Sequence, residues 1–105
     1  MDSVTKAPAV PDGKVIAAVE NGSGSKVLEL QGGFSSGNLA VAVNCEGKGT
    51  LQVTLEPVGL SFPMKCKDGE VFSTYNQFAL KRARQEASVS VQASSKVRWS
   101  MTVAQ

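Results

Sequence analysis

Apolar and polar residues alternate along most of this chain, and the period of two residues is that of a β-strand. The clearest segment covers residues 38–45, and the same alternation recurs over 50–55, 87–93 and 97–103. Side chains of a strand point alternately to its two faces, so each of these segments predicts one buried and one solvated face.

Four further segments predict shorter or less regular strands. Residues 15–19 form an apolar run that is too short and too β-branched to favour a helix, and residues 26–30 and 70–74 have similar strand character. Residues 58–66 contain Pro63, which cannot donate a ladder hydrogen bond. This segment is therefore expected at a sheet edge or as a bulged strand.

The connections between these segments are rich in turn-forming residues. Residues 21–24 predict a turn, although Asn21-Gly22-Ser23 also matches the N-glycosylation pattern, and residues 31–37 predict a flexible loop. Residues 46–49 and 94–95 are expected to close hairpins. Residues 75–83 predict either one helical turn or a loop that crosses the molecule.

The two cysteines indicate a disulfide. Cys45 and Cys66 are the only cysteines, they enclose 20 residues (66 − 45 − 1), and a zinc site would lack ligands because the chain has no histidine. Each cysteine continues the apolar face of its strand, so both sulfurs should point into the core and form one bridge. Two free buried thiols in a cytosolic protein are the alternative.

These segments together predict an all-β fold. Short strands at regular spacing, glycine-rich turns and no convincing amphipathic helix favour an antiparallel β-sandwich of about seven to nine strands, jelly-roll or immunoglobulin-like. Residues 14–105 are expected to form this single domain. Residues 1–13, with Pro8 and Pro11, are expected to be a flexible tether or a remnant left by expression.

The composition limits the classes of partner. Hydrophobic residues make up 42% of the chain and charged residues 19%, which suits a folded globular domain. Eleven Lys and Arg against nine Asp and Glu give a net charge of +2, too small to indicate nucleic-acid binding. No apolar stretch is long enough for a transmembrane segment.

The sequence does not predict an enzyme. Without histidine, neither a serine nor a cysteine nucleophile has the usual general base. The carboxylates are distributed among turns and polar strand faces, with no spacing that brings a catalytic pair together. No cofactor and no metal site are expected.

Two groups of residues are candidates for binding. Lys81, Arg82 and Arg84 form the only basic cluster, which could contact an acidic partner or could be a solvated turn. Aromatic rings can serve as binding platforms, and the candidate ligand contacts are Tyr75 with the neighbouring amide of Asn76, Phe34 in its glycine-rich loop, and Trp99. The parity of Trp99 with Val97 and Met101 favours a core position for the indole, and Tyr75 could instead anchor a loop.

The segments 43–51 (VNCEGKGTL) and 97–103 (VRWSMTV), the second cysteine and Tyr75-Asn76 resemble those of small secreted or lipid-anchored β-sandwich proteins of actinobacteria, of unknown function. The resemblance covers about residues 15–103 and implies export and a sandwich fold. It implies no activity for any residue. The first residues lack an apolar leader, so a leader or a lipid-anchored cysteine is expected upstream.

These observations predict a non-catalytic exported binding module, secreted or associated with the cell envelope. Its expected partner is another protein, contacted through loops at one end of the sandwich or through an edge strand. A carbohydrate-binding module that uses the aromatic residues is the alternative. The chain is expected to be a monomer or a weak dimer.

Overall fold

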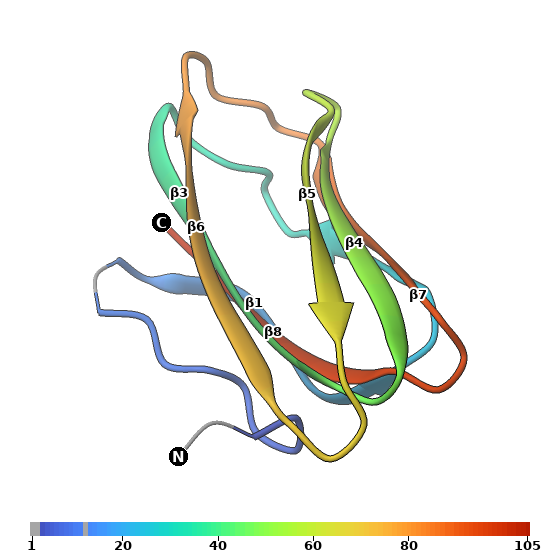
Figure 1. Ribbon diagram of the computed structural model, residues 1–105. Coiled ribbons are helices and arrows are strands. Elements are labelled where there is room, and N and C mark those ends of the chain that lie inside the picture. The colour runs from blue at the N-terminus through green and yellow to red at the C-terminus, as the bar shows by residue number, and fades with distance from the viewer. Residues whose placement is uncertain (1–2, 12) are drawn as a thin grey trace.

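The computed structural model describes residues 3–11 and 13–105, and these residues form eight β-strands and no helix. The strands make two four-stranded antiparallel sheets that face each other (Figure 1). This arrangement confirms the predicted antiparallel β-sandwich. The strands are β1 (Val15–Ser23), β2 (Lys26–Leu30), β3 (Gly37–Glu46), β4 (Gly49–Glu56), β5 (Leu60–Cys66), β6 (Phe72–Leu80), β7 (Ala87–Ala93) and β8 (Arg98–Ala104).

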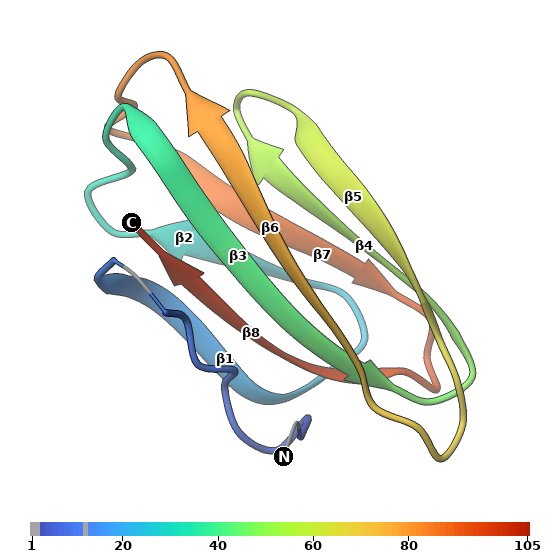
Figure 2. The ribbon, with the colours of Figure 1, turned by 60° about the vertical axis from the view of Figure 1, so that its left-hand side comes forward.

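The strand order is that of a jelly roll. Sheet A has the order β1-β8-β3-β6 and sheet B the order β2-β7-β4-β5. The pairs β1–β8, β2–β7, β3–β6 and β4–β5 are all antiparallel, so the chain is one long hairpin of paired strands that is wound into two layers (Figure 2). The immunoglobulin alternative requires a different division of strands between the sheets.

Two predicted hairpins are wrong. Residues 46–49 and 94–95 do turn the chain, but each connects a strand of one sheet to a strand of the other. Among consecutive strands, only β4 and β5 are hydrogen-bonded to each other. A turn signal in the sequence marks where a strand ends, and it does not say which sheet the next strand joins.

Two strands are longer than predicted. β1 continues to Ser23, into the turn expected at residues 21–24, with Asn21 at φ 53° and a register shift between Val19 and Gly22. Gly22 is required by a close approach, because a Cβ there would lie 2.8 Å from Trp99 Cε2. β6 extends to Leu80, so the helical turn or loop expected over residues 75–83 is wrong and Tyr75 lies in a strand.

The core lies between the sheets, and a disulfide closes one end of it. Cys45 on β3 is bonded to Cys66 on β5, so the bridge connects sheet A to sheet B and confirms the predicted pairing. Trp99 is fully buried beside Cys45, its register partner on β3. Its indole Nε1 donates a hydrogen bond to the Gly24 carbonyl oxygen (3.0 Å), which satisfies the polar atom in the core.

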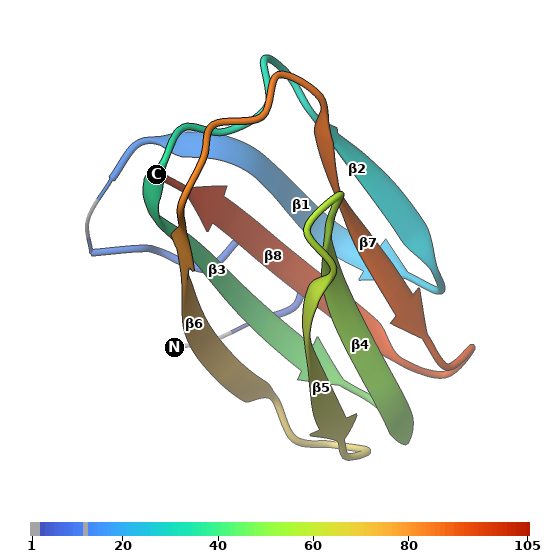
Figure 3. The same cartoon turned by 90° about the horizontal axis from the view of Figure 1, so that it is seen from above.

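Residues 3–11, which belong to the segment expected to be a tether, pack against the sandwich. We call residues 3–11 the N-terminal arm; it lies against the outer face of sheet A, on the side away from sheet B (Figure 3). Asn44 Nδ2 and Ser100 Oγ both donate to the Ser3 carbonyl oxygen, at 3.0 and 2.9 Å. Thr102 Oγ1 donates to the Pro8 carbonyl oxygen at 2.6 Å. Residue 12 lies outside the described residues, as do residues 1 and 2.

Candidate binding surfaces

An apolar cleft with basic residues lies at the end of the sandwich opposite the disulfide. Its volume is about 240 Å³. The β4–β5 connection and the start of β5 form one wall, and the end of β6 with the β6–β7 loop forms the other. We call this depression the end cleft; its lining residues are Val58, Leu60, Ala79, Leu80, Lys81, Arg82 and Arg84.

Backbone contacts fix both walls of the end cleft. Gly59 N donates to the Leu55 carbonyl oxygen (2.8 Å) and closes the turn that presents the neighbouring apolar side chains. Phe34 and Arg84 exchange two backbone hydrogen bonds of 2.9 Å, which attach the β6–β7 loop to the β2–β3 loop. Gly33 allows this contact, because a Cβ at that position would overlap the Arg84 carbonyl oxygen.

The basic cluster predicted from sequence is part of this end cleft. Lys81, Arg82 and Arg84 are all exposed. The sequence did not indicate that two apolar side chains lie across from them. Val58 and Leu60 are 39% and 40% exposed. The available signal was their position around Gly59, since large aliphatic side chains are uncommon in an exposed turn.

The structure separates the four aromatic and amide candidates. Phe34 is 4% exposed and Trp99 is fully buried, so neither side chain can serve as a surface platform. The expectation for Phe34 is wrong because the loop folds its ring into the core next to the Arg84 bridge. Tyr75 is 43% exposed on the outer face of sheet A, whereas Asn76 on the opposite face of β6 is half-buried. Tyr75 is the only aromatic side chain among the exposed large hydrophobic residues described, so no exposed aromatic pair is present in that part of the chain.

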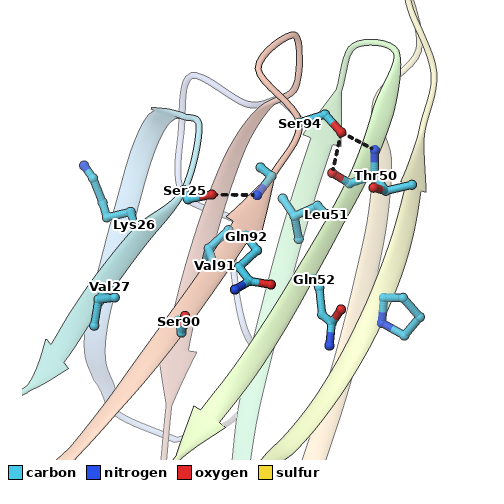
Figure 4. Close-up of a pocket in the computed structure, with 12 residues that line it drawn as sticks. Ser25, Lys26, Val27, Thr50, Leu51, Gln52, Ser90, Val91, Gln92 and Ser94 are labelled. Atoms are coloured by element: carbon cyan, nitrogen blue, oxygen red, sulfur yellow. Dashed lines mark hydrogen bonds between the residues drawn. The ribbon is translucent and has the colours of Figure 1, made fainter.

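A second depression lies on the outer face of sheet B. It is wide and shallow, with a volume of about 870 Å³. Gln52 and Gln92 are register partners on β4 and β7, and their amides lie side by side at its centre (Figure 4). Ser25 and Ser94 lie at its rim and bond to backbone groups of neighbouring strands. We call this surface the amide face; apart from Lys26, its lining side chains carry no charge.

The carboxylates of the described residues form no cluster of the metal-binding type. Glu46 Oε2 accepts a hydrogen bond from Gly69 N at 3.4 Å, which places this carboxylate against the β5–β6 turn. In residues 3–11 and 13–105, no three side chains of the types His, Cys, Asp and Glu gather closely enough to hold a metal ion.

Comparison with protein-family models, with curated proteins and with solved structures found no match to this chain. Within the described ranges, no helix is long and apolar enough to cross a membrane. The disulfide is compatible with an extracellular location. The class that the fold defines is a jelly-roll β-sandwich whose two sheets are joined by one disulfide.

Proposed function

We propose that this protein is a non-catalytic exported binding module and that it contacts another protein through the end cleft. The observation that carries the proposal is the convergence of three exposed cations with exposed aliphatic side chains in one cleft of about 240 Å³. The matching partner is an acidic segment that also presents an aliphatic side chain.

The two kinds of lining residue have different roles in this proposal. Val58 and Leu60 offer apolar surface that a partner's aliphatic side chain can cover, and burial of such surface is worth about 25 cal/mol per Å². The side chains of Lys81, Arg82 and Arg84 surround this surface with positive charge. Charges at the rim of an interface select the partner and raise the association rate more than they raise affinity.

Export is the second part of the proposal. A disulfide between two sheets persists in an oxidising compartment and is rare in reducing ones, which supports a site of action outside the cytosol or at the cell envelope. The absence of histidine and the scattered carboxylates support a non-catalytic role.

The experiment is a screen of extended peptides that combine acidic and aliphatic residues, with binding measured by fluorescence polarisation. We expect Lys81→Gln/Arg82→Gln/Arg84→Gln to weaken the best peptide at least about tenfold, a change of 1.4 kcal/mol. Val58→Ser/Leu60→Ser should weaken it by a similar factor, and only the contribution of the cations should disappear at high salt.

A matched control removes the same charge from the other end of the molecule. Lys48→Gln/Lys65→Gln/Lys96→Gln changes three exposed lysines outside the end cleft, and it should leave peptide affinity unchanged. Equal losses in both triple variants would show that net charge, and not this cleft, governs binding. Absence of any peptide that discriminates between them would contradict the proposal.

Carbohydrate binding is the second candidate, and the amide face favours it. Uncharged amide and hydroxyl groups can form hydrogen bonds with sugar hydroxyls, and the volume of the depression, about 870 Å³, is within the range of small-molecule sites. Of the aromatic side chains considered for this candidate, Phe34 and Trp99 are buried, and Tyr75 remains exposed. A glycan array on the wild type and on Gln52→Ala/Gln92→Ala distinguishes the candidates, since only a ligand of the amide face loses affinity in the variant.

A further inference from the structure

The jelly roll has four edge strands, and three of them carry features that prevent pairing with another strand. β1 has two register shifts, and its Asn21 N–H is already bonded to Val4 O at 2.7 Å. β2 has only five residues and includes Lys26 and Glu29. β5 contains Pro63, which has no backbone N–H to donate, and the charged Lys65. Charges, proline, bulges and short length are the usual protections of a sheet edge.

β6 has none of these protections. It is nine residues long, it pairs with β3 without any register shift, and it contains no proline, no glycine and no charged residue (Phe72–Leu80, FSTYNQFAL). It is the last strand of sheet A, with β3 as its sole neighbour in that sheet (Figure 2). A long, regular and uncharged edge is a template for pairing with another strand.

The side chains along this edge are incompletely buried as well. The inward-facing residues of β6 from Phe72 to Phe78 are only half-buried, whereas the inward residues of the adjacent β3 are fully buried. Phe78 and Phe62 of β5 lie 6.1 Å apart between ring centroids, and both are only partly covered. Apolar surface therefore remains open along the side of the sandwich where β6 ends sheet A.

We propose that β6 pairs with β6 of a second copy of this chain, antiparallel about Asn76, to form a symmetric dimer with a continuous sheet. This register makes the strand complementary to itself. On the inner face, Phe72 lies opposite Leu80 and Thr74 opposite Phe78 of the other copy. On the outer face, Tyr75 lies opposite Gln77, and no like charges meet along the strand.

The outer-face pair already shows compatible chemistry within one chain. Gln77 Nε2 donates to Tyr75 Oη at 3.2 Å, and the same donor and acceptor would face each other across the proposed interface between the two β6 strands. The assembly stops at two copies, because the opposite edge of sheet A cannot pair in the same way. That edge is β1, which has register shifts and whose Asn21 N–H donates to the Val4 carbonyl oxygen. An isologous interface of this kind closes and leaves no free β6 edge.

The test uses charge at the interface between the two β6 strands. Sedimentation equilibrium up to millimolar concentration should show a reversible dimer for the wild type. Tyr75→Lys/Gln77→Lys places lysine opposite lysine, and Tyr75→Glu/Gln77→Glu places glutamate opposite glutamate, so each should raise the dimer dissociation constant at least about tenfold. A mixture of the two variants pairs opposite charges and should dimerise at least as tightly as the wild type.

The control places the same charge change on the other side of the sandwich. Val27→Lys/Glu29→Gln adds two positive units to β2 and should dimerise as the wild type does. A monomeric wild type at every concentration overturns the proposal. So does a lysine variant that still dimerises, or a mixture of the two charged variants that stays monomeric. The peptide-binding test of the end cleft has an independent readout, so either idea can fail alone.

Discussion

The outer faces of both sheets carry polar side chains on their two central strands, yet these side chains are buried on sheet A and open on sheet B. On sheet A, outward-facing Asn44, Ser100 and Thr102 are at most 2% exposed, because the N-terminal arm lies over them and accepts their hydrogen bonds. On sheet B, Gln52 and Ser90 face outward in the amide face with no segment of the described chain above them.

Alternation along a strand therefore identifies the face on which a side chain lies, but not whether that face is buried. A polar residue on an outward face is solvated only where nothing covers the sheet. On sheet A the polar side chains are retained because the arm offers carbonyl oxygens that they can satisfy, and no buried side-chain N or O atom among the described residues lacks a partner. On sheet B the outward-facing amides of Gln52 and Gln92 are exposed.

Loss of the disulfide, which joins the two sheets, should reduce stability more than any change to either outer face. Replacing Cys45 and Cys66 by serine should lower the free energy of unfolding by about 3 kcal/mol, because the bridge no longer restricts the unfolded chain over this loop. Urea unfolding of the wild type with and without reductant measures the effect. The serine variant should not respond to reductant, and an unaltered urea midpoint after complete reduction would contradict the assignment of a stabilising bridge.

A lysine substitution should destabilise the protein on the covered face of sheet A but not on the open face of sheet B. Ser100 and Ser90 are outward serines on the second strand of their respective sheets. Ser100→Lys must displace the arm or bury a charge, so the free energy of unfolding should fall by about 1–3 kcal/mol. Ser90→Lys should stay within about 0.5 kcal/mol of the wild type, as surface substitutions usually do.

Urea denaturation, monitored by tryptophan fluorescence, measures the stability of both variants, because the buried Trp99 reports when the core unfolds. Equal losses of unfolding free energy in the two lysine variants would mean that the arm does not make the outer face of sheet A less tolerant of charge than that of sheet B. A larger loss of unfolding free energy in Ser90→Lys than in Ser100→Lys would contradict the assignment of the covered face to sheet A.

This contrast also explains what could be predicted from the sequence. The strand segments, the edge position of β5 with Pro63, the disulfide and the buried Trp99 all follow from period, proline chemistry and parity, which are local properties. The hairpins at residues 46–49 and 94–95 were wrong, and the contacts of residues 3–11 with sheet A were not foreseen, because strand pairing in a jelly roll and contacts of the arm join segments far apart in the chain.

The candidate surfaces were predictable to a smaller extent. Lys81, Arg82 and Arg84 stand out in the sequence because three cations lie within four residues, and the structure places them in one cleft. Their proximity to Val58 and Leu60 depends on two loops that meet only at the end of the folded sandwich. The burial of Phe34 depends on its bridge to Arg84, which no local pattern encodes.

A smaller effect is expected from a single amide on the covered face. Asn44 Nδ2 donates to Ser3 O, and Asn44 Oδ1 accepts from Ser73 Oγ at 2.7 Å. Asn44→Ala should therefore lower the free energy of unfolding by about 1–2 kcal/mol, because the hydrogen bonds to the Ser3 carbonyl oxygen and from the Ser73 hydroxyl are both lost. Gln52→Ala on the third strand of sheet B is the matched control and should change stability by less than about 0.5 kcal/mol. Similar urea midpoints for the two variants would contradict this prediction.

The smallest expected effect concerns the attachment of the arm and not the sandwich itself. Thr102→Val keeps the shape of the side chain but removes the donor to the Pro8 carbonyl oxygen, a loss of about 0.5–1.5 kcal/mol that falls on the arm. The exposed Lys6 lies within the arm, so trypsin cleavage there reports how often the arm leaves the sheet. Cleavage at Lys6 should be several-fold faster in Thr102→Val and unchanged in Thr54→Val, its counterpart on the outer face of sheet B. Equal cleavage rates in both variants would mean that the arm is not held by this bond, and the contrast between the two outer faces would then depend on the Ser3 contacts alone.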